Sequence, residues 1–245
     1  AGVVVVISAG NNGQEATGNN PEGFATDSAR AGNGLVIIAG SHGTSTDPRA
    51  ISEFSNRAGS SGANYLTALG YRVRAFDHTG DAFLFSGTSF SAPVISGAAA
   101  LLASAFPNLT GAQIVDILFR SADDAGASGI DSVFGTGILN IARAFQPMGQ
   151  TSLTGSGAPV STTSSGNGQT SGPMGDAKIP VVGAVILDGY SRAYAVELAQ
   201  ALSPAPRKQV AEGPAVGVRR LAADQRARHG RARRHRVEPH GRVAL

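Results

Sequence analysis

Two continuous apolar runs, made mostly of β-branched residues, limit the folds open to this chain more than any other feature. Residues 3–7 read Val-Val-Val-Val-Ile, and residues 35–38 read Leu-Val-Ile-Ile. A strand with one face in water alternates apolar and polar residues, whereas a short, fully apolar run is typical of a strand covered on both faces. The first run therefore predicts a central strand, and the second predicts another buried strand of an α/β protein.

The first run ends in a glycine-rich turn, Ala-Gly-Asn-Asn-Gly at residues 9–13. Open α/β sheets bind their ligands beyond the carboxyl ends of the strands, so this turn lies where a site is expected. An asparagine in such a turn is usually only a left-handed turn residue. Asn11 becomes a candidate site residue only in combination with a second motif further along the chain.

That second motif is the stretch 87–97, which reads Gly-Thr-Ser-Phe-Ser-Ala-Pro-Val-Ile-Ser-Gly and leads into an apolar run. It predicts a helix with Ser89 in its first turn, where the helix dipole stabilises developing negative charge. Pro93 is expected to be tolerated. Proline has no N–H, and near the helix start an N–H would have no hydrogen-bond partner in any case. The alternative is that Ser89 only caps a buried helix.

The stretch resembles the Gly-Thr-Ser signature of the subtilisin-like serine proteases, the subtilases, and Ser89 matches the family nucleophile. The turn at residues 9–13 resembles the family segment whose asparagine amide donates to the oxyanion, and Asn11 matches that asparagine. The resemblance implies that Ala9 and Gly10 line the pocket for the substrate side chain before the scissile bond. It covers residues 1–146 and implies part of a three-layer α/β fold with a mostly parallel sheet.

Two histidines lie in motifs that look like those of the subtilase triad but occur too late in the chain. The His-Gly-Thr at His42 follows Asn11 instead of preceding it, and His42 is expected in a surface loop. The segment around His78 is expected to form a turn between strands near 73–76 and 83–85. The family's Asp and His motifs and its calcium loop lie upstream of Asn11, so we expect this chain to be inactive by itself. A triad rewired through either histidine is the alternative.

Beyond the nucleophile helix, Thr110 is predicted to cap an amphipathic helix that ends near Asp123. The apolar side of that helix is expected to comprise Ile114, Val115, Ile117 and Leu118. The glycine-rich segment 134–141 resembles the closing segment of subtilase domains, and its glycines are expected to allow close backbone packing. A last helical turn is expected at 142–145.

Composition divides the rest of the chain. Residues 1–148 are the subtilase-like part, and the Ser/Thr/Gly-rich residues 149–174 predict a flexible linker. Residues 175–205 predict two short strands around a turn at 189–192 and resemble the region that follows the protease in autotransporters of Gram-negative bacteria. Residues 206–245 predict a disordered basic tail.

Charge is distributed unevenly. From Arg207 onward the chain holds eleven Lys or Arg and three acidic residues, which leaves nine of its 20 basic and 14 of its 17 acidic residues for the rest. The tail lacks aromatic residues, so no nucleic-acid partner is expected, although a basic-tailed nucleic-acid binder is one alternative. Cysteine is absent, and no cofactor is identified from this sequence, although calcium is possible in the full-length parent. No apolar run is judged long enough for a membrane helix.

The resemblance therefore implies a serine endopeptidase that hydrolyses peptide bonds through an acyl-enzyme at Ser89, with Asn11 as an oxyanion donor. Its expected partners are protein or peptide substrates. Its expected location is outside a Gram-negative cell or on the cell surface. The alternative from another class is a non-catalytic passenger or binding module that keeps the fold without the activity.

Overall fold

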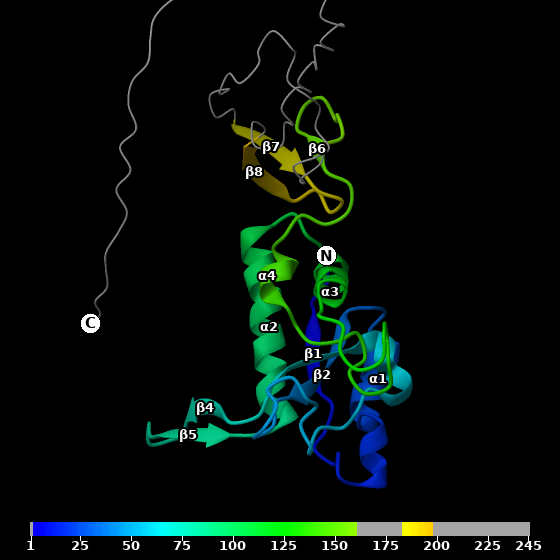
Figure 1. Ribbon diagram of the computed structural model, residues 1–245, viewed down its shortest axis with the longest axis vertical. Helices are drawn as coiled ribbons and strands as arrows, with labels where there is room; N and C mark the ends of the chain where they lie inside the picture. Colours follow the sequence, from blue (N-terminus) through cyan, green and yellow to red (C-terminus); the bar gives the residue numbers. More distant parts are fainter. Residues whose placement is uncertain (1, 161–182, 198–245) are drawn as a thin grey trace, which may run out of the picture. The chain divides into compact units, whose positions relative to one another are not determined.

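The computed structural model describes residues 2–160 and 183–197. Its strands are β1 (Val5–Ser8), β2 (Val36–His42), β3 (Tyr65–Leu69), β4 (Val73–Phe76), β5 (Ala82–Phe85), β6 (Ser152–Leu153), β7 (Gly183–Leu187) and β8 (Ala193–Glu197) (Figure 1). Its helices are α1 (Gly23–Ala31), α2 (Thr88–Ala105), α3 (Gly111–Arg120) and α4 (Ile141–Ala144), with short 3-10 helices η1 (Ala16–Asn19) and η2 (Gly59–Asn64). The predicted basic tail, residues 161–174 of the predicted linker, and residues 175–182 and 198–205 of the predicted two-strand segment lie outside the described residues.

The central sheet has the strand order β1-β2-β3, and both pairings are parallel. Val6 lies opposite Ile37, and Ile38 lies opposite Tyr65. β2 is buried along its whole length except at His42, as expected for a continuous apolar run. The predicted α/β class with a parallel sheet is confirmed.

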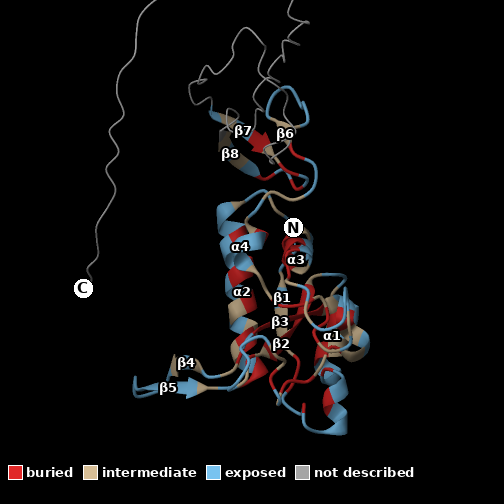
Figure 2. Cartoon of the chain, viewed as in Figure 1, coloured by how far each residue is buried: buried red, intermediate tan, exposed pale blue. Residues whose placement is uncertain are grey.

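Side chains of β2 alternate between two apolar clusters on the two faces of the sheet. Ile37 and Ala39 pack with residues of α2 and α3, whereas Val36 and Ile38 pack with alanines of α1. This alternation follows from the two-residue period of a strand. Figure 2 shows the buried residues gathered in the sheet and on the adjoining sides of the helices. Helices therefore cover both faces, which gives the predicted three-layer order.

The prediction of a central first strand is wrong for the described part of the chain. β1 pairs with β2 alone, so it forms an edge of the three-stranded sheet. Val3 is 80% exposed, and Val5 is 43% exposed. The sequence run carries the apolar character of a buried strand, but burial requires a neighbour on each side, and the described residues supply one on a single side.

α2 packs along β1, β2 and β3, and its residues Ile95 and Leu102 are fully buried there. Its 18 residues have a mean hydropathy of 1.3, so it is long and apolar enough to cross a membrane by length and composition alone. It is the one helix in the described ranges that meets these two criteria. This corrects the expectation that no apolar run reaches such a length. Length and composition alone are weak indications, because a core helix also meets them.

α3 begins as predicted. The Thr110 hydroxyl accepts a hydrogen bond from the Gln113 N–H, and the Gln113 side chain accepts one from the Thr110 N–H. The four predicted apolar residues are all buried, which confirms the amphipathic pattern. The helix ends at Arg120, three residues before Asp123, because Ser121 follows it as the C-cap. The predicted last helical turn is α4.

β4 and β5 form an antiparallel hairpin, with Phe76 opposite Ala82. The Asp77 carboxylate accepts hydrogen bonds from the Thr79 hydroxyl and from the Thr79 and Asp81 N–H groups, which closes the turn between them. The predicted turn around His78 is therefore confirmed. Phe76 is 66% exposed and so lies outside the main core.

A second sheet has the order β6-β7-β8, and both pairings are antiparallel. The two predicted strands around residues 189–192 correspond to β7 and β8. β6 and the buried Thr151 fall inside the segment predicted to be a flexible linker. That prediction is wrong over these residues, because β6 gains its hydrogen bonds from β7, 30 or more residues away, and composition does not reveal such a partner.

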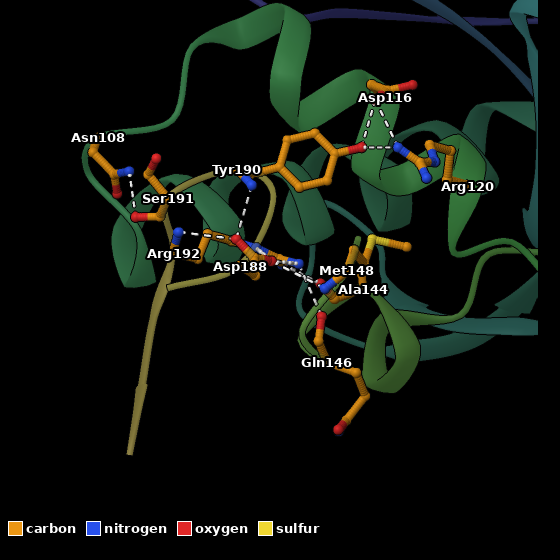
Figure 3. Close-up of polar contacts among 10 residues, drawn as sticks. All are labelled: Asn108, Asp116, Arg120, Ala144, Gln146, Met148, Asp188, Tyr190, Ser191 and Arg192. Atoms are coloured by element: carbon orange, nitrogen blue, oxygen red, sulfur yellow. Dashed lines mark hydrogen bonds and ion pairs between the residues drawn. The ribbon is translucent and has the colours of Figure 1, made fainter. Parts of the chain in front are cut away.

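The turn between β7 and β8 attaches to the helices through Arg192 (Figure 3). The guanidinium is fully buried and bonds to the Asp188 carboxylate, with N···O distances of 2.9 and 2.7 Å. It also donates to the carbonyls of Ala144 and Gln146 at 2.6 and 2.8 Å. The rings of Phe106, Tyr190 and Tyr194 surround it, with centroids 5.2 to 5.6 Å from its central carbon. Each of the three guanidinium nitrogens therefore has at least one protein acceptor.

Candidate active site

Ser89 is the second residue of α2, directly after Thr88 and the extended N-cap Gly87. Its side chain is exposed. Within the described ranges, neither its hydroxyl nor its N–H has a hydrogen-bond partner. The first N–H groups of a helix have no intrahelical acceptor and carry the positive end of the dipole. This serine therefore lies beside free N–H donors, where an anion is stabilised.

Pro93 differs from its expected position. It is the sixth residue of α2, so its missing N–H would have bonded to the carbonyl of Ser89 four residues earlier. The expectation that this N–H would have no partner is wrong, because the helix begins at Thr88. The proline leaves the carbonyl of Ser89 without its intrahelical donor.

Asn11 lies at the carboxyl end of β1, and its side-chain oxygen is held by Thr88. The Asn11 Oδ1 accepts hydrogen bonds from the Thr88 N–H at 2.9 Å and from the Thr88 hydroxyl at 3.1 Å. A backbone N–H can only donate, so this contact fixes which end of the amide faces the helix. The Asn11 Nδ2 lies 3.6 Å from the place where a Cβ on Gly87 would be. The amide N–H₂ is thereby presented at the start of α2.

Thr88 joins the two halves of this arrangement, and the sequence analysis did not single it out. It is buried, and its hydroxyl lies 3.3 Å from the Gly10 nitrogen and 3.4 Å from the Gly10 carbonyl oxygen, besides its contact with Asn11. One residue of the helix start thus fixes the turn after β1. Its place between Gly87 and Ser89 in the motif was the signal available in the sequence.

Ala9 and Gly10 form the backbone of the turn that leads to Asn11. The Ala9 side chain is fully buried, its N–H donates to the Ala39 carbonyl, and its carbonyl accepts from the Glu22 N–H, both at 2.9 Å. Gly10 has a φ of +106°, a conformation that L side chains rarely adopt. Any contact of these two residues with a ligand is therefore made by backbone atoms.

Asn56 is a second residue that sequence spacing did not indicate, because it lies 44 residues from its partner Asn12. Its side chain accepts from the Asn12 N–H at 2.7 Å, and its own N–H donates to the Gly10 carbonyl at 3.0 Å. It is 2% exposed, and the Tyr65 hydroxyl donates to its carbonyl at 2.5 Å. The turn after β1 is thus held from two sides, by Thr88 and by Asn56.

An open hollow lies beside this turn. It has a volume of about 580 Å³ and is lined by Gly13, Gln14, Glu15, Ala16, Glu53 and Arg57. Two of these side chains are acidic and one is basic. In the part of the chain that the structure describes, no group of three or more His, Cys, Asp or Glu residues is arranged to hold a metal ion.

His42 is not the surface-loop residue that was expected. It is the last residue of β2, lies opposite Leu69 of β3, and is only partly exposed. Its Nδ1 lies 2.8 Å from the Pro48 carbonyl oxygen, so this nitrogen carries the proton. Burial lowers the pKa of His42, the hydrogen bond to Pro48 opposes that effect, and the charge of Arg49 adds to it.

His78 lies exposed in the hairpin turn after β4. Among the described residues, neither His78 nor His42 forms a hydrogen bond or ion pair with Ser89 or Asn11. The structure therefore brings together the predicted serine and asparagine, with Ala9 and Gly10 beside them. It does not bring either histidine into contact with the serine.

The chain is similar to known proteins over more than half of its length. The sequence model of the subtilase family matches residues 1–137 of the chain. Mycosin-1 of Mycolicibacterium smegmatis is 34% identical over 157 residues, which cover 57% of this chain and 34% of that protein. The family match covers more than half of the chain and places it in a known class of serine proteases. The chain belongs to the subtilase family.

Shorter stretches of the chain are similar to two other proteins. The autotransporter lipoprotein NalP of Neisseria meningitidis is 44% identical over 59 residues, which cover 24% of this chain and 6% of that protein. An extracellular serine protease of Serratia marcescens is 43% identical over 56 residues, or 23% of this chain and 5% of that protein. The solved structure of the self-cleaved protease domain of PatA has a TM-score of 0.43 and 26% identity, and covers 58% of this chain and 49% of that one. The chain spans about a third of the length of Mycosin-1.

Proposed function

We propose that this chain carries the nucleophile and the oxyanion site of a serine endopeptidase that cleaves peptide bonds through an acyl-enzyme. Ser89 is the proposed nucleophile, and Asn11 is a proposed oxyanion donor. Ala9 and Gly10 are the proposed wall of the pocket for the substrate side chain before the scissile bond. The proposed substrates are proteins or peptides.

One observation carries the proposal. Thr88 holds the oxygen of the Asn11 amide through two hydrogen bonds, so the N–H₂ group of the amide is free to donate at the start of α2. The N–H of Ser89 lies at the same helix start and has no other acceptor in the described structure. Two unpaired donors next to an exposed serine hydroxyl are what an oxyanion site requires.

In the proposed reaction, the Ser89 Oγ attacks the scissile carbonyl carbon while its proton passes to a general base. The carbonyl oxygen becomes an oxyanion, which accepts hydrogen bonds from the Asn11 Nδ2 and the Ser89 N–H. The tetrahedral intermediate then expels the amine, which takes a proton from the base, and leaves the acyl group on Ser89. Water attacks the acyl-enzyme by the same route and releases the acid.

A serine hydroxyl is a weak nucleophile at neutral pH without an adjacent base. His42 is engaged with Pro48, and His78 is exposed in a hairpin turn. We therefore propose that the base comes from residues outside this sequence and that the 245-residue chain is inactive by itself.

The test compares the 245-residue chain with its full gene product, using a fluorophosphonate probe and intact-mass detection. The full gene product is expected to gain one label, which Ser89→Ala abolishes, and the shorter chain is expected to gain none. Asn11→Ala is expected to lower turnover of a peptide substrate by roughly 10²–10³, a magnitude measured in a subtilisin. Asn12→Ala, one residue away, is the matched control and retains turnover to within a few-fold.

Each outcome decides between hypotheses. If the full gene product gains no label and cleaves no peptide, the chain is a non-catalytic passenger or binding module. If the shorter chain is labelled at Ser89, a base within this sequence activates it, and a triad through His42 or His78 replaces the proposed arrangement.

We also propose that the protein acts outside the cytoplasm, secreted or on the surface of a Gram-negative cell. Two similar proteins, an autotransporter lipoprotein and an extracellular serine protease, support this location. The absence of cysteine is compatible with it. Protease treatment of intact cells, followed by detection of residues 1–148 with an antibody, tests the location. If the protein is fully protected from protease in intact cells and is also absent from the medium, this location is contradicted.

A further inference from the structure

The Glu22 carboxylate lies against the proposed substrate pocket. The backbone N–H of Glu22 donates to the Ala9 carbonyl at 2.9 Å, which fastens the start of α1 to the turn after β1. One carboxylate oxygen of Glu22 lies 2.6 Å from the place that a Cβ on Gly10 would occupy. Because residue 10 is a glycine and has no Cβ, the carboxylate can occupy this space. It is therefore in direct contact with the residue before Asn11.

This carboxylate has no partner within the described ranges: it accepts no hydrogen bond and forms no ion pair there. The two neighbouring acids differ in this respect. Glu15 accepts hydrogen bonds from the Asn12 and Thr17 side chains, and Glu53 accepts one from Gln14. Glu22 is exposed, so its carboxylate is accessible from the solvent.

A second unpaired polar group points to the same place. Asn56 is 98% buried, and the two hydrogen bonds described above fix its backbone and its side-chain oxygen. Its Nδ2 lies 2.7 Å from the same hypothetical Cβ on Gly10 and donates no hydrogen bond to any residue in the described ranges. An amide donor and an unpaired carboxylate therefore converge on one side of Gly10, with no hydrogen bond between them in the described structure.

The charge around the turn has one predominant sign. Glu15 and Glu53 line the hollow beside it, and Arg57 is the basic residue in that lining. The Arg57 guanidinium donates to the Asn19 side chain, not to any of the three glutamates. A concave surface with an excess of one charge attracts ligands of the opposite charge.

From these contacts we infer that Glu22 selects substrates with Lys or Arg immediately before the scissile bond. The inference rests on the proposed function, in which Asn11 binds the carbonyl oxygen of that substrate residue and Gly10 borders its side chain. A long cationic side chain passing Gly10 reaches the Glu22 carboxylate and gives it the donor it lacks.

The experiment uses the full gene product and four peptides that differ only at the residue before the cleaved bond: Lys, Arg, norleucine or Glu. Wild-type protein is expected to cleave the Lys and Arg peptides with kcat/KM on the order of 10- to 100-fold above norleucine, the range of a hydrogen bond to a charged group. The preference is expected to shrink at high salt, because exposed charges are screened.

Glu22→Gln keeps the shape of the side chain and removes the charge, and it is expected to abolish most of the Lys-to-norleucine preference. Glu22→Lys is expected to shift the preference toward the Glu peptide, a gain that misfolding cannot produce. Asp27→Asn is the matched control, because that carboxylate lies on α1, pairs with Arg30 at 3.2 Å and does not line the hollow, and it is expected to retain the preference.

The outcomes separate this inference from the proposed function. No Ser89-dependent cleavage of any peptide would overturn the proposed function. Ser89-dependent cleavage without a preference for Lys or Arg, or a preference that survives Glu22→Gln, would overturn the role of Glu22 and leave the endopeptidase assignment intact.

Discussion

Replacing Arg192 by methionine tests how the β7–β8 turn is held to the helices. Arg192 and Asp188 have side chains that are 0% exposed, and they form a direct ion pair. The same guanidinium bonds to the carbonyls of Ala144 and Gln146. Methionine fills a similar volume between the aromatic rings but offers no positive charge and no donor. The variant therefore leaves a buried carboxylate without its cation and two carbonyls without a donor.

The expected cost follows from that list of losses. Removing one partner of a buried ion pair destabilises a protein by roughly 3–5 kcal/mol, because the other charge stays buried and uncompensated. Since 1.4 kcal/mol is a factor of ten, the equilibrium for attachment of the turn should fall by about two to nearly four orders of magnitude. Asp188 retains backbone hydrogen bonds from Tyr190 and Met148, so part of its charge remains solvated by the protein.

Hydrogen exchange with mass spectrometry is the assay. Peptides from residues 183–197 should lose protection by the factor given above in Arg192→Met, while peptides from β2 and β3 should keep theirs. The double variant Arg192→Met with Asp188→Asn should recover much of the loss, because it leaves no uncompensated buried charge and the Asn oxygen still accepts from the backbone N–H groups of residues 190 and 192. Unchanged protection in the single variant, or no recovery in the double variant, would refute the reasoning.

Three further predictions concern the same part of the protein and the core. Burial would raise the pKa of Asp188, but the hydrogen bonds from Arg192, Met148 and Tyr190 outweigh it and hold the pKa below its usual range. Protection of residues 183–197 from hydrogen exchange should therefore be complete above about pH 4 and decline as the pH falls through the lowered pKa. Hydrogen exchange at several pH values measures this. Thr110→Ala removes the cap of α3 and should lower the free energy of unfolding by about 1 kcal/mol in urea titrations, whereas an unchanged value would contradict the capping-box geometry. Leu102→Ala, at a fully buried position of α2, should lower the free energy of unfolding by roughly 2–5 kcal/mol. Leu101→Ala, at the neighbouring position that is 54% exposed, should lower it by less than about 0.5 kcal/mol. Equal effects would mean that α2 does not pack as described.

Several elements could be predicted because local physics decides them. The capping box at Thr110 and the apolar spacing of α3 define that helix within the chain itself. Residues 36–38 are apolar on both faces, and β2 is buried on both faces. The position of Ser89 in the first turn of α2 follows from the glycine before it and the apolar run after it.

Other features depended on partners far away in the sequence. β1 has the composition of a central strand but lies at an edge, since a strand's place in a sheet is set by its neighbours. β6 lies in a segment of linker composition and becomes a strand because β7 supplies its hydrogen bonds. The buried state of Arg192 likewise requires Asp188, two carbonyls and three rings assembled around it.

The sequence by itself determined the family and the parallel α/β class, and it singled out the serine and asparagine that we propose as site residues, because these reside in short motifs and in the period of apolar residues. The tertiary structure decided how these residues are oriented. Thr88 turns the Asn11 amide so that its N–H₂ group is free, and the start of α1 brings the Glu22 carboxylate against Gly10. Such contacts join residues separated by 12 to 77 positions, and chain-local propensities carry no information about which distant groups will meet.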